Sequence, residues 1–325
     1  MIVPQFWAEA RVQDKTRERQ VTVRRYGWSD TSQEDAQAVA ESRASEALRK
    51  ILSGEKIDRR EPKVPYNGAD GMPIREEILS RHGDTIITRN SYGARCLNTP
   101  DVLFADLDFP HGTSSGLYAA IFPAMVIGGV AIGVWKGNTQ IGLLAFGALG
   151  LLLPLVIFLF YKVFPRPAID HHRNTLQCIE DFSARNPDWH LRVYETPAGF
   201  RVLAMHDTFD PAGDEAARCF RELGTDKIYV RMCANQRCFR ARVSPKPWRI
   251  GISAHLRPRP GVWPVAPERL PLREAWVRDY EQRATGYASC RFVTRLGSER
   301  VHPAAQEVAT LHDELSRATS ALPIA

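Results

Sequence analysis

Two long apolar runs, separated by only five residues, constrain the possible folds of this chain more than any other feature. Residues 117–135 read LYAAIFPAMVIGGVAIGVW, residues 141–164 read IGLLAFGALGLLLPLVIFLFYKVF, and the connector is KGNTQ. A helix needs about 20 residues to cross the roughly 30 Å of hydrocarbon in a bilayer. The sequence therefore predicts a transmembrane helical hairpin over residues 117–164, inside an otherwise polar chain.

The basic residues nearest the two runs predict the orientation of this hairpin. Five flank the pair and one lies in the connector, namely Arg89, Arg95, Lys162, Arg166 and Arg173 against Lys136. Cytoplasmic loops are enriched in Lys and Arg, and six cysteines without a CxxC pair are typical of a reducing compartment. We therefore expect a multi-pass protein of the inner (plasma) membrane with two spans, both termini in the cytoplasm, and the lipid bilayer as a partner.

The polar flanks predict a cytoplasmic α+β domain that the hairpin interrupts. Residues 1–80 are expected to form a helical and loop region, and residues 81–116 and 166–325 one α+β domain. From residue 101 onward, the periodicity predicts strand 101–109, helix 168–187, strands 190–195 and 200–206, helix 213–224, and strands 228–232 and 238–244. With the hairpin set aside, this is the ferredoxin-like (split βαβ) order of an antiparallel sheet with helices on one face.

Two aspartates close the strand VLFADLDF, and they are candidate metal ligands. Residues two apart in a strand point to the same face, so Asp106 and Asp108 are expected about 6–7 Å apart on one side of the sheet. Such a pair can bind Mg²⁺, whose other ligands come from water and substrate phosphates. The sequence thus predicts a magnesium site at this strand end.

This strand and the order of elements around it resemble the palm domain of nucleotidyl transferases, including primase-like proteins and nucleotidyl cyclases. The resemblance implies Mg²⁺-dependent phosphoryl or nucleotidyl transfer, with the two aspartates holding the metal. Cations that would neutralise phosphate are expected at five positions: Arg201, Arg240, Arg242, Lys246 and Arg249. Segments such as ITRNSYGARCLNTPDVLFADLDF and CFRARVSPKPWRIGI also resemble bacterial proteins described only as transmembrane proteins, which implies a membrane location and no activity.

The segment from Lys227 to Pro267 is strongly basic, with nine Lys or Arg and no Asp or Glu. Such a surface suits the phosphates of anionic lipid headgroups, nucleotides or nucleic acid, and Trp248 and Trp263 suit a membrane interface. One alternative to an enzyme is therefore a non-enzymatic membrane-anchored adaptor that binds anionic lipid or a protein partner through this basic face. Two other interpretations are a membrane-tethered nucleic-acid binder and a solvated basic face whose tryptophans belong to a small core. A homo-oligomer is also consistent with the sequence.

Overall fold

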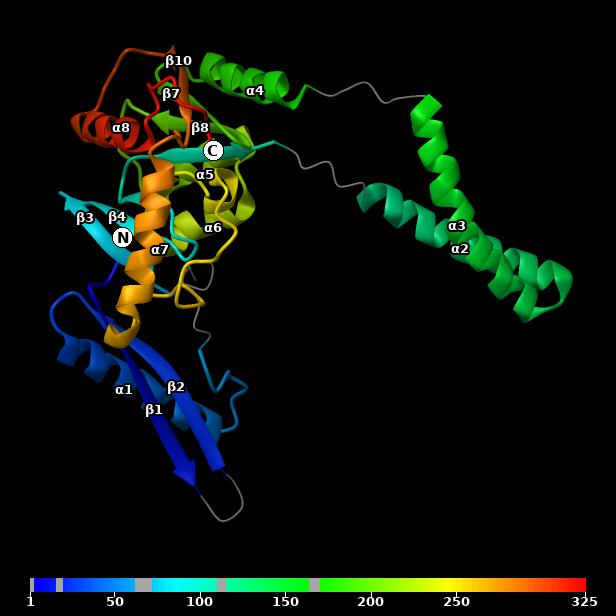
Figure 1. The fold of residues 1–325 in the computed structure, drawn as a ribbon, viewed down its shortest axis with the longest axis horizontal. Coiled ribbons are helices and arrows are strands. Elements are labelled where there is room, and N and C mark those ends of the chain that lie inside the picture. Colours follow the sequence, from blue (N-terminus) through cyan, green and yellow to red (C-terminus); the bar gives the residue numbers. More distant parts are fainter. Residues whose placement is uncertain (1–2, 16–19, 62–71, 110–114, 164–169) are drawn as a thin grey trace. The chain divides into compact units, whose positions relative to one another are not determined.

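The computed structural model describes residues 3–15, 20–61, 72–109, 115–163 and 170–325 (Figure 1). The chain divides into two compact units, Met1–Asp108 with Thr175–Ala325, and Phe109–Asn174. The larger unit combines helices with antiparallel sheets, which confirms the predicted α+β class.

A strand hairpin and a helix form the N-terminal part of the larger unit. Strands β1 (Phe6–Lys15) and β2 (Gln20–Ser29) pair antiparallel, and α1 (Gln33–Leu52) packs on them. The buried side of α1 is a row of small residues four apart: Ala36, Ala40 and Ala44. A Cβ on Gly27 would lie 2.2 Å from Ala36 O and from Ala40 N, so glycine at this position allows the close approach. The region expected as helix and loop therefore also contains strands.

A second sheet has the strand order β3-β4-β5-β9. Its strands are β3 (Glu77–His82), β4 (Thr85–Arg89), β5 (Arg95–Thr99) and β9 (Phe239–Arg242). Strand β9 comes from far along the chain and pairs antiparallel with β5, with Cys96 opposite Arg242. The predicted strand 238–244 therefore extends this sheet and not the one that contains Asp106.

The sheet that contains Asp106 has the order β10-β7-β8-β6, so the ferredoxin-like prediction is wrong. Its strands are β6 (Phe104–Asp108), β7 (His190–Thr196), β8 (Gly199–Ala204) and β10 (Arg291–Gly297). A ferredoxin-like sheet places its fourth strand beside its first, whereas β10 pairs with β7. Phe292 of β10 packs edge-on against Tyr194 of β7, with ring centroids 5.8 Å apart, and the expected fourth strand pairs with β5 instead.

The second half of the chain contributes further helices. They are α4 (His171–Arg185), α5 (Asp214–Leu223), α6 (Lys227–Gln236), α7 (Leu270–Ala284) and α8 (Pro303–Ser316). The segment 228–232, predicted as a strand, belongs to α6. Asp226 caps this helix because its Oδ1 accepts hydrogen bonds from Ile228 N and Tyr229 N, both at 2.9 Å. Buried Met232, Cys233 and Gln236 then recur at helical spacing.

The smaller unit contains a helical hairpin made of α2 (Ser115–Lys136) and α3 (Thr139–Val163). Glycines lie where the two helices meet. A Cβ on Gly142 would lie 2.9 Å from Gly129 O and 3.0 Å from Gly133 Cα. These small residues therefore permit a closer helix contact than any larger side chain would.

Among the described residues, no helix is both long enough and apolar enough to cross a membrane. This finding contradicts the predicted transmembrane hairpin, the inner-membrane localisation with two spans, and the membrane anchoring in the alternatives above. The apolar runs form two helices as predicted, but the predicted spans at 117–135 and 141–164 are not supported.

Candidate anion-binding site

Asp106, a predicted metal ligand, is paired with an arginine. Arg201 on β8 lies opposite Asp106 in the sheet, with its Nε 2.7 Å from Oδ1 and its Nη2 3.2 Å from Oδ2. The side chain of Arg201 is 2% exposed and that of Asp106 is 33% exposed. Burial lowers the pKa of Arg201, but the charge and hydrogen bonds of Asp106 outweigh burial and raise that pKa above its ordinary value. Asp106 therefore neutralises a buried cation.

Prolines shape the segment that follows β9. Pro245 lacks the N–H that a continuing strand would need, and Pro247–Ile250 forms a short 3₁₀ helix. The hydroxyl of Tyr280 on α7 donates to Pro245 O at 2.8 Å. At the start of the segment, the carbonyl of Arg242 accepts a hydrogen bond from Arg201 Nη1 at 2.8 Å. These contacts hold the segment next to the strand that carries Asp106.

Three of the predicted phosphate ligands lie on this segment, and we call Arg242, Lys246 and Arg249 the cationic cluster. Burial, and then repulsion by Arg242 and Arg249, lowers the pKa of Lys246. Burial and the charge of Arg242 likewise lower the pKa of Arg249. Asp108 acts in the opposite direction on both groups, so the end of β6 lies near the cluster. Arg242 therefore disfavours the charged forms of Lys246 and Arg249 in the protein without a ligand.

Two N–H groups of the cationic cluster are buried and have no hydrogen-bond acceptor within the described parts of the chain. They are Arg242 Nε and Arg249 Nη1. Leaving a buried donor unsatisfied costs about 1–3 kcal/mol, and such a group often indicates an ion or ligand that binds there. An anion that reached these buried atoms would accept hydrogen bonds from them.

Two aromatic rings border the cationic cluster. Tyr92, in the turn between β4 and β5, packs edge-on against Trp248, with ring centroids 5.3 Å apart and an interplanar angle of 61°. Lys246 Nζ lies 5.4 Å from the centroid of the Trp248 ring. Burial raises the pKa of Tyr92, while the nearby charge of Arg242 lowers it. Tyr92 is not among the site residues predicted from the sequence, although the Asn-Ser-Tyr-Gly stretch around it is typical of a turn.

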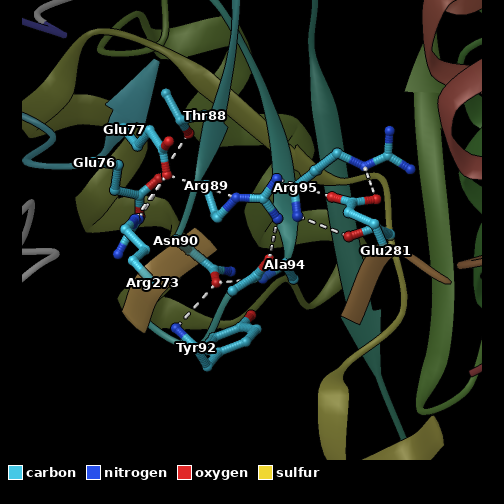
Figure 2. A network of polar contacts seen from close by, with 12 residues as sticks. Glu76, Glu77, Thr88, Arg89, Asn90, Tyr92, Ala94, Arg95, Arg273 and Glu281 are labelled. Atoms are coloured by element: carbon cyan, nitrogen blue, oxygen red, sulfur yellow. Dashed lines mark hydrogen bonds and ion pairs between the residues drawn. The ribbon is translucent and has the colours of Figure 1, made fainter. Parts of the chain in front are cut away.

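The turn that carries Tyr92 is fixed by hydrogen bonds and by close packing. Asn90 Oδ1 accepts from the backbone N–H of Tyr92 at 3.2 Å and of Ala94 at 3.0 Å (Figure 2). Gly93 has φ +101°, and a Cβ there would lie 2.2 Å from the ring of Trp276 on α7. The turn therefore requires glycine at this position, and α7 limits its movement.

A chain of ion pairs also ties this turn to α7 (Figure 2). Arg89 Nη2 donates to Glu281 Oε1 at 2.9 Å, and Arg89 Nη1 donates to Gly93 O at 2.8 Å. Glu77 Oε2 lies 3.7 Å from Arg89 Nε and accepts from Arg273 Nη2 at 2.8 Å. Because buried ion pairs add little net stability, we assign this chain of contacts a role in orienting the turn.

Arg240, another predicted phosphate ligand, is paired inside the β3-β4-β5-β9 sheet. Its Nη2 lies 2.8 and 2.7 Å from the two carboxylate oxygens of Glu76, and its Nη1 lies 3.2 Å from Asn98 Oδ1. The side chain of Glu76 is 1% exposed. Arg240 therefore balances a buried carboxylate, and these contacts do not support its predicted role in phosphate binding.

The contacts of Asp106 fit a magnesium site poorly. Both of its carboxylate oxygens accept hydrogen bonds from Arg201, so they face a cation. Across the described ranges, no group of three or more His, Cys, Asp or Glu side chains is arranged to hold a metal ion. The Mg²⁺ site at Asp106 and Asp108 stays a prediction.

A buried polar group behind Arg201 was not predicted from the sequence. His312 on α8 places Nε2 3.3 Å from Arg201 Nη1 and 3.9 Å from Cys290 Sγ, and its Nδ1 lies 3.3 Å from Asp313 Oδ1. A Cys, a His and an Asp in contact resemble the nucleophile, base and orienting group of thiol enzymes. Cys290 and His312 are both 0% exposed, so we assign them a structural role beneath Arg201.

Comparisons with known proteins do not place the chain in a family. No family model, no curated protein and no solved structure matches the chain. The resemblance to palm-type nucleotidyl transferases therefore stays a prediction.

Proposed function

We propose that the larger unit binds a phosphate-bearing ligand at the cationic cluster. The observation that carries this proposal is the pair of buried donors, Arg242 Nε and Arg249 Nη1, which lack an acceptor among the described residues. Guanidinium groups donate to phosphate oxygens in a forked geometry, and a lysine ammonium adds a point charge. A multiply charged phosphate would satisfy both donors and offset the repulsion at Lys246.

The same contacts favour binding over magnesium-dependent transfer. Metal-assisted phosphoryl transfer needs carboxylates that are able to coordinate the ion, and the oxygens of Asp106 are engaged by Arg201. The cluster also borders Trp248, which is 56% exposed. Transfer sites commonly exclude water from the reacting groups, whereas a binding site can remain open to solvent.

Calorimetric titration of the full chain with inorganic pyrophosphate tests the proposal. Arg249→Met keeps most of the side-chain stem and removes the unsatisfied donor, so we expect a loss of affinity of about tenfold or more. Arg257→Met is the matched control, because Arg257 is an exposed arginine of the same acid-free segment outside the cluster. Absence of binding by the wild type, or equal losses in the two variants, would refute the proposal.

A further inference from the structure

We infer that the phosphate bound by the cationic cluster belongs to a nucleotide whose base stacks on Trp248, an inference that rests on the proposed phosphate binding. The feature behind it is an aromatic surface that packing leaves open. Trp248 is 56% exposed, although an exposed indole forgoes a large gain from burial.

Trp263, the other tryptophan of the basic segment, differs from Trp248 in its surroundings. The Arg273 guanidinium lies 5.4 Å from the centroid of the Trp263 ring, and Trp263 O accepts from Arg75 Nε at 2.7 Å. Trp263 therefore takes part in the packing around α7. Trp248 contacts the ring of Tyr92 on one side and exposes more than half of its surface.

The ring of Trp248 and the cations are fixed to one short segment. Trp248 lies in the 3₁₀ helix Pro247–Ile250, between Lys246 and Arg249, and Lys246 Nζ is 5.4 Å from its ring centroid. A nucleotide carries a planar base and an anionic group one sugar apart, which matches an aromatic face beside cations. A lipid headgroup or free phosphate offers no planar ring that could stack on the indole, whereas a nucleotide does.

The nucleotide has two possible sources, a free mononucleotide or a unit of a single strand. Proteins that bind single strands combine stacking aromatic side chains with a basic track along the backbone. Exposed Arg257 and Arg259 continue the basic segment beyond the cationic cluster. The chemistry recognised by Trp248 is the same in both cases, and the length of the ligand distinguishes them.

Calorimetry of the full chain with three probes tests the inference. ADP and inorganic pyrophosphate carry matched diphosphate groups, and a single-stranded dT₆ oligonucleotide represents a strand. We expect ADP to bind more tightly than pyrophosphate, and Trp248→Leu to weaken ADP binding about tenfold while pyrophosphate binding changes by less than about twofold. Trp248→Phe retains a ring and is expected to restore part of the ADP affinity.

Each outcome has a defined meaning. Tighter binding of dT₆ than of ADP, lost in Trp248→Leu, would support a strand as the source, and the opposite order would support a free nucleotide. Equal binding of ADP and pyrophosphate, unaffected by Trp248→Leu, would refute the nucleotide inference and leave phosphate binding intact. Failure of all three probes to bind would refute both. The thermal unfolding midpoint of each variant shows whether a loss reflects misfolding.

Discussion

Asp106 and Arg201 form an ion pair in which each side chain engages the charged group of the other. Arg201 is 2% exposed, and a buried cation without a counter-charge is strongly unfavourable. Asp106 supplies that counter-charge with both oxygens. The carboxylate predicted to bind a metal therefore balances a buried charge of the protein itself.

Replacement of Asp106 tests this assignment. Asp106→Asn keeps the side-chain shape and removes the charge, so the free energy of unfolding is expected to fall by about 1.5–3 kcal/mol, the contribution of a hydrogen bond to a charged group. Urea denaturation in the presence of EDTA measures this change without any metal. Asp84→Asn, at an exposed position in the turn between β3 and β4, is expected to change it by less than about 0.5 kcal/mol. An Asp106→Asn protein as stable as the wild type would contradict the assignment.

Lys246 is expected to lower stability in the ligand-free protein. Its pKa is lowered by burial and by Arg242 and Arg249, so its charged form is disfavoured in the folded state. Lys246→Met keeps the stem and removes the charge, and it should raise the free energy of unfolding by up to about 1 kcal/mol after solvent screening. Thermal unfolding checks this, and a clear decrease in the midpoint would contradict it.

The pH dependence of ligand binding follows from the same lowered pKa. Below its folded-state pKa, Lys246 is charged in both the folded and the unfolded protein, and the cost of its charge in the folded state lowers the free energy of unfolding in full. Above the ordinary pKa of 10.5, Lys246 is neutral in both states and this cost disappears. Free-protein stability should therefore rise through this window, while pyrophosphate affinity falls as the ammonium deprotonates. Calorimetry from neutral to alkaline pH should show this loss in the wild type and a smaller one in Lys246→Met. Identical profiles would show that Lys246 does not contact the ligand.

The turn between β4 and β5 is the element that places Tyr92 at the site. Its conformation depends on Asn90, on a glycine with positive φ, and on the ring of Trp276 from α7. The ion pairs of Arg89 and Glu281 connect the same two elements (Figure 2). A change far from the cations can therefore alter the ligand site through this turn.

Alanine substitutions at two glycines distinguish the effect of backbone strain from the effect of packing. Gly93→Ala adds strain at φ +101° and an overlap with Trp276, so the free energy of unfolding should fall by about 3 kcal/mol or more. Gly83→Ala is the control, since Gly83 has φ +57° and nothing within 4 Å of an added Cβ. It should cost only about 1–2 kcal/mol. Equal losses in urea denaturation would mean that Trp276 does not constrain the turn.

Local patterns in the sequence predicted single elements better than their pairing. The alternation in residues 190–206 correctly indicated the β7–β8 hairpin. It did not reveal that β9 pairs with β5, because that pairing depends on contacts about 140 residues apart, such as Arg240 with Asn98. The β-branched residues of 228–232 suggested a strand, but the cap at Asp226 and the helical spacing of buried residues determine a helix.

The cations of the candidate site could be predicted from the sequence, but their spatial arrangement could not. The absence of acidic residues from 227 to 267 drew attention to this segment. Nothing in the sequence indicated that Arg240 is paired with Glu76 or that Arg201 is paired with Asp106. These pairings follow from strand register and from which sheet each strand joins.

At the scale of the whole molecule, the basic segment accounts for the positive charge of the chain. The chain has 43 basic and 37 acidic residues. Removing the nine cations of residues 227–267 leaves 34 basic against the same 37 acidic residues. The excess positive charge is therefore local, which favours attraction of an anion to this segment over a general attraction to anionic surfaces.

Salt should weaken the binding of pyrophosphate accordingly. Raising the NaCl concentration from about 0.05 to 0.5 M shortens the screening length from more than 10 Å to a few ångströms, so calorimetry should show a several-fold loss of affinity. The loss should be smaller in Arg249→Met, which has one cation fewer at the cluster, and unchanged in Arg257→Met. An affinity that does not vary with salt would contradict a charge-based site.

Phosphate binding at the cationic cluster can be tested by thermal unfolding of the wild type and of Arg242→Met/Arg249→Met, each with and without inorganic pyrophosphate. We expect the double variant to unfold at a higher temperature than the ligand-free wild type, because buried unsatisfied donors and charge repulsion are removed. Pyrophosphate is expected to raise the midpoint of the wild type only. A double variant that unfolds earlier and still responds to pyrophosphate like the wild type would show that the cationic cluster stabilises the fold and binds no phosphate.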